Sequence, residues 1–190
     1  MNTTPWLVLQ KTGLMIAILW LATGAVWAAN IHVSPDADNA AERLTEALIN
    51  VEPGDTIRLG NGRFELEDGL SLDVDNVTIQ GNGTDSSILS FADQKGGGEG
   101  LLITSSKVVL EGFAVENTKG DGIKSKGSDE ITFRNLRVEW TDGPKETNGA
   151  YGIYPISSKN VLIENVTVSG ASDAGIYVGQ REYIIVRNNI

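Results

Sequence analysis

The chain contains no cysteine and only one histidine, and both shortages exclude chemistry. Without a thiol there is no disulfide framework, no lipid-modified cysteine, no thiol nucleophile and no thiolate metal site. The single histidine, His32, lies near the start of the chain, and one imidazole cannot build a cage of several histidines around a metal. We expect His32 to be an ordinary strand or loop residue, which leaves no histidine for a catalytic triad.

Positive charge is also scarce. The 190 residues include 25 acidic and 15 basic side chains, for a formal net charge of −10. This charge disfavours nucleic acid and anionic lipid surfaces as partners. The glycine-rich runs at 81–83 and 96–98 lack the Lys-Ser/Thr of a phosphate-binding loop and open no helix, so they do not indicate phosphate binding.

The only long apolar stretch lies in residues 1–28, which have the pattern of an export signal. Lys11 precedes an apolar segment from Leu14 to Ala22, and small residues favour cleavage after Ala28. The apolar segment is shorter than the roughly 20 residues that span a bilayer, so cleavage is favoured over a membrane anchor. We therefore predict an exported protein, periplasmic or extracellular, with no membrane span after the signal is removed.

A motif recurs from residue 69 to the end of the chain: a glycine, an aliphatic residue, and a β-rich run that begins seven or eight positions after the aliphatic residue. The five glycines are Gly69, Gly100, Gly122, Gly152 and Gly175. They are separated by 31, 22, 30 and 23 residues. A period of this size is typical of a solenoid, in which each repeat packs only on its neighbours.

Each repeat divides into three short strands: one after the glycine, one in the β-rich run and one after a two-residue corner. Hydrophobic residues alternate with polar ones, as in Val161, Ile163, Val166 and Val168, which predicts strands with one buried face. The corner carries glycine or asparagine at one offset (Gly81, Gly112, Asn135, Asn165 and Asn188). We predict an all-β parallel β-helix of three sheets, with the three asparagines hydrogen-bonded in an inward-facing column.

Residues 29–52 are predicted to close the N-terminal end. A short strand is expected at 31–33, and residues 39–50 have the pattern of an amphipathic helix, with Asp38 or Asn39 as its N-cap. Such a helix would cover the first coil, as terminal caps do in repeat proteins. The repeats then occupy residues 53–190 and stop in mid-repeat. We therefore expect the sequence to be a fragment, with further coils missing at the C-terminus. We also expect the protein to be a monomer.

The repeats resemble the right-handed parallel β-helix superfamily, which includes pectate lyases, polygalacturonases and alginate epimerases. Residues 121–179 are similar to a group of exported bacterial β-helix repeat proteins of unassigned activity. The resemblance implies a right-handed coil and, in members that act on polysaccharides, a substrate groove along the first strand, walled by the loops that lead into it. The Asp-Pro-His-Asp motif of mannuronan epimerases is absent, which speaks against that activity.

One of these loops is long. Fourteen positions separate Val138 from Gly152, against seven for the equivalent loops before Gly122 and Gly175. Surface loops commonly carry function, although a loop without a role is an equal alternative. The predicted substrate contacts in this insertion are Trp140, Lys145, Glu146 and Tyr151.

The predicted groove also carries Lys124, Tyr154 and Tyr177 at equivalent outward positions. Tyrosine rings suit sugar rings, and Lys124 offers a cation to an acidic sugar. Acidic residues precede several first strands, and Asp121, Asp142 and Asp173 could supply oxygens to a Ca²⁺ ion, or could be solvated loop tips.

Three functions remain open on this evidence. A uronate lyase or epimerase would use Lys124 as base, Tyr154 or Tyr177 as proton donor, and Ca²⁺ held by Asp121 and Asp173. A glycoside hydrolase would need two carboxylates from the set Asp121, Asp142, Glu146 and Asp173. A non-catalytic β-helix would bind carbohydrate, adhere to surfaces or serve as a periplasmic accessory protein, like the copper-enzyme maturation proteins that share these repeats. A polysaccharide or other glycan is the expected partner in most of these readings.

Overall fold

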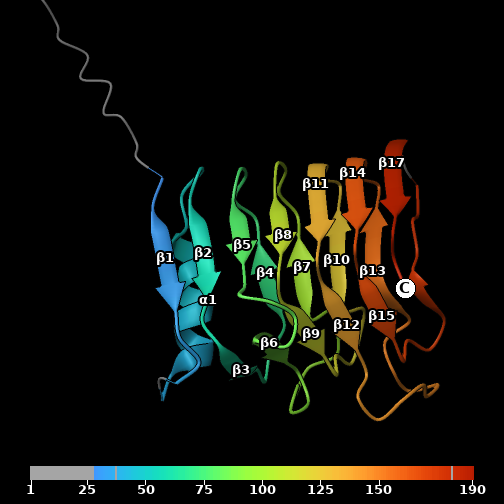
Figure 1. The fold of residues 1–190 in the computed structure, drawn as a ribbon, viewed down its shortest axis with the longest axis horizontal. Coiled ribbons are helices and arrows are strands. Elements are labelled where there is room, and N and C mark those ends of the chain that lie inside the picture. The colour runs from blue at the N-terminus through green and yellow to red at the C-terminus, as the bar shows by residue number, and fades with distance from the viewer. Residues whose placement is uncertain (1–27, 37, 181) are drawn as a thin grey trace, which may run out of the picture.

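The computed structural model describes residues 28–36, 38–180 and 182–190. The predicted export signal therefore lies outside the described residues, apart from its last position. Within them the chain forms a parallel β-helix whose coils follow one another along the long axis (Figure 1). None of the helices in the described ranges has the length and apolar character needed to cross a membrane.

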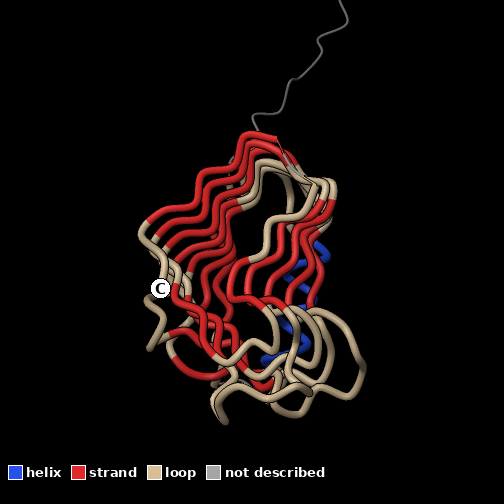
Figure 2. Tube along the Cα trace, turned by 90° about the vertical axis from the view of Figure 1, so that its right-hand side faces the viewer, coloured by secondary structure: helices blue, strands red, loops and turns tan. Residues whose placement is uncertain are grey.

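The coils build three parallel sheets, which correspond to the three predicted strands of the repeat. Sheet I contains β4 (Leu70–Leu72), β7 (Leu101–Ile103), β10 (Ile123–Lys126), β13 (Tyr151–Ile156) and β16 (Ala174–Ile176). Sheet II contains β1 (Asn30–Val33), β2 (Thr56–Leu59), β5 (Thr78–Gln80), β8 (Val109–Glu111), β11 (Asp129–Arg134), β14 (Lys159–Glu164) and β17 (Glu182–Arg187). Sheet III contains β3 (Gly62–Glu65), β6 (Ser87–Ser90), β9 (Ala114–Glu116), β12 (Arg137–Glu139) and β15 (Thr167–Ser169). Figure 2 shows the stacked strands surrounding the interior of the coil.

The glycine motif sets the register of sheet I. The aliphatic residues that follow the five glycines pair with one another from coil to coil, as in Ile123 with Ile153 and Ile153 with Ile176. The glycines lie where the chain passes from sheet III into sheet I, and three of them, Gly122, Gly152 and Gly175, lie against valine side chains of third strands. A Cβ atom on Gly152 would lie 2.3 Å from Cγ1 of Val168. The corner therefore requires glycine because there is no room for a side chain.

Gly152→Ala is accordingly expected to destabilise the coil. Overpacking at a filled site costs about 1–3 kcal/mol, and the backbone carbonyl of Gly175, 2.7 Å from the added Cβ, limits any shift. Gly96→Ala is the matched control, since nothing lies within 4 Å of a Cβ at that position. Thermal melting followed by circular dichroism checks both variants. Equal melting temperatures for Gly152→Ala and Gly96→Ala would contradict the steric explanation.

The N-terminal elements cover the first coil as predicted. Helix α1 (Ala40–Asn50) buries Leu44, Ala47 and Leu48 and contacts β1, β3 and β4. Strand β1 pairs in parallel with β2, so it also extends sheet II. Asn39 occupies the N-cap position, but its side chain makes no capping hydrogen bond.

The prediction of an inward-facing asparagine column is wrong in its orientation. Asn135, Asn165 and Asn188 are exposed at the corner between sheets II and III. The amide of Asn165 does donate to Oδ1 of Asn135 at 3.2 Å, so one ladder bond exists, but on the surface. All three residues have a positive φ of 51–57°, and Gly112 has 73°. Asparagine and glycine recur here because they tolerate the left-handed conformation that the corner requires.

Candidate functional site

Three tyrosines gather on the outer face of sheet I near its last two strands. Tyr151 and Tyr154 belong to β13, and Tyr177 directly follows β16. The rings of Tyr151 and Tyr177 are stacked, with centroids 4.6 Å apart and an interplanar angle of 15°. Tyr154 is tilted against both, at 4.8 and 5.4 Å. Since Tyr177 is 44 % exposed, this tyrosine face is open to a ligand.

Lys124 adjoins the tyrosine face from the preceding strand, where it pairs in register with Tyr154. Its Nζ lies 5.0 Å from the Tyr154 ring centroid, 2.6 Å from Oε1 of Glu99 and 3.3 Å from Oδ2 of Asp121. Burial works to lower the pKa of Lys124, but the hydrogen bond and charge of Glu99, helped by Asp121, raise it overall. The same hydrogen bond lowers the pKa of Glu99. Lys124 is therefore a protonated member of an ion pair at neutral pH, which is at odds with its predicted role as a base.

Tyr151 connects the tyrosine face to Asp173. Burial raises the pKa of Tyr151, and a hydrogen bond to Asp173, together with the charge of that carboxylate, raises it further. The Tyr151 hydroxyl thus donates to Asp173. Asp173 is exposed, and no basic side chain of the described residues lies within ion-pair distance of it.

The three predicted calcium ligands have different partners. Asp121 contacts Lys124, Asp142 pairs with Lys145 at 2.9 Å, and Asp173 accepts from Tyr151. Across the described part of the chain, no group of three or more His, Cys, Asp or Glu side chains is placed to hold a metal ion. The predicted Ca²⁺ site thus has no cage of carboxylates in this structure and stays a prediction.

The predicted substrate contacts of the 139–151 insertion, which joins sheet III to sheet I, do not lie together in the structure. Trp140 is only 5 % exposed, and its Nε1 donates to the carbonyl oxygen of Thr118 at 2.7 Å. The indole ring fills the base of the loop. Because it is buried there, little of its surface is left for a ligand to contact. Lys145 and Glu146 are exposed in the loop, whereas Tyr151 lies on the tyrosine face.

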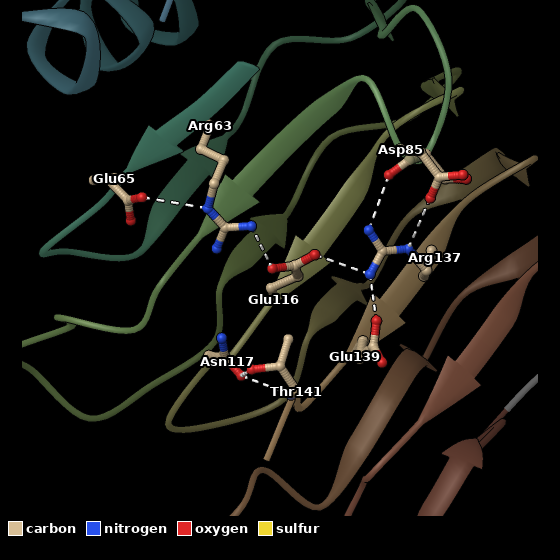
Figure 3. Close-up of polar contacts among 9 residues, drawn as sticks. Arg63, Glu65, Asp85, Glu116, Asn117, Arg137, Glu139 and Thr141 are labelled. Carbon is tan, nitrogen blue, oxygen red and sulfur yellow. Dashed lines mark hydrogen bonds and ion pairs between the residues drawn. The ribbon is translucent and has the colours of Figure 1, made fainter. Parts of the chain in front are cut away.

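A charged cluster on sheet III was not predicted from the sequence (Figure 3). Glu116 of β9 is its centre, with a side chain that is only 4 % exposed. Oε2 of Glu116 lies 2.8 Å from Nη1 of Arg63, and Oε1 lies 2.9 Å from Nη1 of Arg137. Arg137 also contacts Glu139 and Asp85. The ionic groups of this cluster are paired with one another, so we infer that the cluster stabilises the fold and does not bind a ligand.

A hollow of about 660 Å³ lies between α1 and the segment that joins β3 to β4. It is lined by the carboxylates Glu42, Glu46, Glu65, Glu67, Asp68 and Asp93 and by no basic residue. Carboxylates gathered in this way disfavour an anionic ligand, but they do not by themselves specify another one. The tyrosine face has ring surfaces and hydrogen-bonding groups as well as charge, and it is the stronger candidate.

The comparisons with known proteins support the fold. A family model described as right-handed beta helix region matches residues 64–190. An alginate lyase from Paenibacillus sp. str. FPU-7 superposes with a TM-score of 0.54 at 15 % identity, covering 85 % of this chain and 75 % of the lyase. A candidate glycosyl hydrolase from Parabacteroides merdae ATCC 43184 gives a TM-score of 0.53 at 12 % identity, covering 85 % of this chain and 95 % of that protein. A search of curated protein sequences finds no significant match.

Proposed function

This chain belongs to the right-handed β-helix family, and from that premise we propose that it binds a polysaccharide along the outer face of sheet I. The observation that carries the proposal is the tyrosine face formed by Tyr151, Tyr154 and Tyr177. Tyrosine rings offer flat apolar surfaces with a polar hydroxyl, which suits sugar rings. The activities named for the two similar structures, an alginate lyase and a candidate glycosyl hydrolase, support a carbohydrate ligand.

The geometry favours binding over proton abstraction by Lys124. A lyase or epimerase needs an unprotonated base near the sugar carboxylate, and the ion pairs with Glu99 and Asp121 keep Lys124 charged. A role for Lys124 in orienting a ligand remains compatible with these contacts.

Glycoside hydrolysis is a second candidate, because Asp121 and Asp173 flank the tyrosine face from coils that are two apart. Two strand spacings correspond to roughly 10 Å, near the upper end of the separation used by inverting enzymes. Release of reducing ends from neutral and charged polysaccharides, measured with and without Ca²⁺, tests this candidate. Binding without release would support the non-catalytic reading.

The binding proposal predicts that Tyr177→Ala weakens glycan binding about tenfold, as expected when an aromatic anchor is truncated. Isothermal titration calorimetry with a panel of neutral, acidic and amino-sugar hexamers provides the measurement. Tyr183→Ala is the matched control, since Tyr183 is 80 % exposed on β17 of sheet II. Equal losses in the two variants, or no binding of any hexamer by the unmodified protein, would contradict the proposal.

A further inference from the structure

We propose that the tyrosine face selects glycans that carry protonated amino groups, such as chains of glucosamine, over polyuronates. This inference rests on the proposed function, because it names the class of sugar that the same face binds. It depends on which charges of the face are already paired and which are available to a ligand.

The cations of sheet I are few. Its strands contain two basic residues, Lys124 and Lys126. Lys124 is held by Glu99 and Asp121, and Lys126 adds its positive charge near Glu99. A uronate carboxylate would have to compete with these carboxylates for the ammonium group of Lys124. Lys126 is exposed at the end of β10, where it pairs in register with Ile156 and not with a tyrosine, so the cation beside the tyrosine rings, Lys124, is the one that is already paired.

The charge left available is negative. Asp173 is exposed beside the tyrosine stack and lacks a basic partner among the residues that the structure describes. It accepts a hydrogen bond from Tyr151, which orients the carboxylate without neutralising its charge. The net charge of −10 also attracts a polycation and repels a polyanion over longer distances.

Lys124 shows how this face holds an ammonium group. Its Nζ lies over the ring of Tyr154 with carboxylate oxygens at 2.6 and 3.3 Å, which combines a cation–π contact with charge-assisted hydrogen bonds. In the coil of β16, Asp173 lies next to Tyr151: its N–H donates to the carbonyl oxygen of Ala150 at 3.2 Å, and the residue after it, Ala174, pairs in register with Tyr151. The Tyr151 ring stacks on Tyr177, so a carboxylate and tyrosine rings meet here as well, and no basic side chain of the described residues pairs with this carboxylate. We expect the ammonium of an amino sugar to bind beside Asp173 while its ring packs on the exposed ring of Tyr177.

The test compares three hexamers of the same length by titration calorimetry: glucosamine, N-acetylglucosamine and galacturonate. The titrations are run at mildly acidic pH, at which the sugar amines are protonated. Glucosamine hexamer is expected to bind about tenfold more tightly than the N-acetyl hexamer, the gain of one charge-assisted contact, and the galacturonate hexamer most weakly. Asp173→Asn should remove most of the preference for the free amine.

Glu46→Gln is the matched control, because it removes one exposed carboxylate from the acidic hollow beside α1. If it weakens glucosamine binding as much as Asp173→Asn does, attraction to the acidic surface explains the binding and the inference fails. Binding of the N-acetyl hexamer through Tyr177 with no gain from the free amine, or tighter binding of galacturonate, would overturn the inference and leave the proposed function intact. Binding of no hexamer would remove both.

Discussion

Glu116→Gln is expected to lower the free energy of unfolding by about 3 kcal/mol, the cost of removing one partner from a buried ion pair. The side chain of Glu116 is 4 % exposed and lies between the guanidinium groups of Arg63 and Arg137. Arg137 is itself largely buried, with 19 % of its side chain exposed, so it cannot regain the lost interaction from water. Urea denaturation followed by circular dichroism measures the loss.

Glu65→Gln is the control for this prediction. Glu65 contacts the same arginine, Arg63, but 58 % of its side chain is exposed. Exposed ion pairs contribute about 0–1 kcal/mol, so this variant should unfold close to the unmodified protein. Similar losses in the two variants would mean that burial of Glu116 does not decide the stability of the cluster.

Trp140→Ala is expected to lower the free energy of unfolding by about 3–5 kcal/mol, as is typical when a buried aromatic side chain is truncated. The indole is 5 % exposed and packs at the base of the 139–151 insertion, where its N–H donates to Thr118. Trp140→Phe keeps an apolar ring but loses the N–H that donates to Thr118. We therefore expect a smaller decrease in the free energy of unfolding, about 1–3 kcal/mol. Denaturant unfolding of both variants gives the two values.

The same pair of variants tests the role that the sequence suggested for Trp140. A substrate contact predicts that Trp140→Phe unfolds normally and loses glycan binding. The buried position predicts the reverse, with reduced stability and glycan binding that survives in the folded fraction. The first pattern would contradict the placement of this side chain in the core.

Much of the fold could be predicted because its signals are local and repeated. The glycine before each first strand marks the register, and at Gly122 and Gly152 a side chain would collide with a valine of a third strand. Alternating hydrophobic residues identified the strands, and the periodic apolar face of 39–50 identified α1. The asparagine corner was located correctly, but a repeat pattern alone does not distinguish an inward column from a left-handed turn.

The candidate site was harder to predict because side-chain partners depend on contacts between coils. The sequence placed Lys124, Tyr154 and Tyr177 in one column, but it did not reveal that Glu99, 25 residues earlier, pairs with Lys124. That contact raises the pKa of Lys124, which disfavours the role as a base that the sequence suggested. The charged cluster on sheet III joins Glu116 to Arg63, which lies 53 positions earlier in the sequence. A repeated Arg-x-Glu pattern on third strands, at 63–65 and 137–139, is the signal that could have located it.

The most direct test of the central claim is an NMR titration of the isotope-labelled protein with glucosamine hexamer. We expect the largest amide shift changes in β10, β13 and β16 and at Tyr177, on the outer face of sheet I. Shift changes confined to α1 and β3, around the acidic hollow, or no change with any of the three hexamers, would contradict the assignment of glycan binding to the tyrosine face.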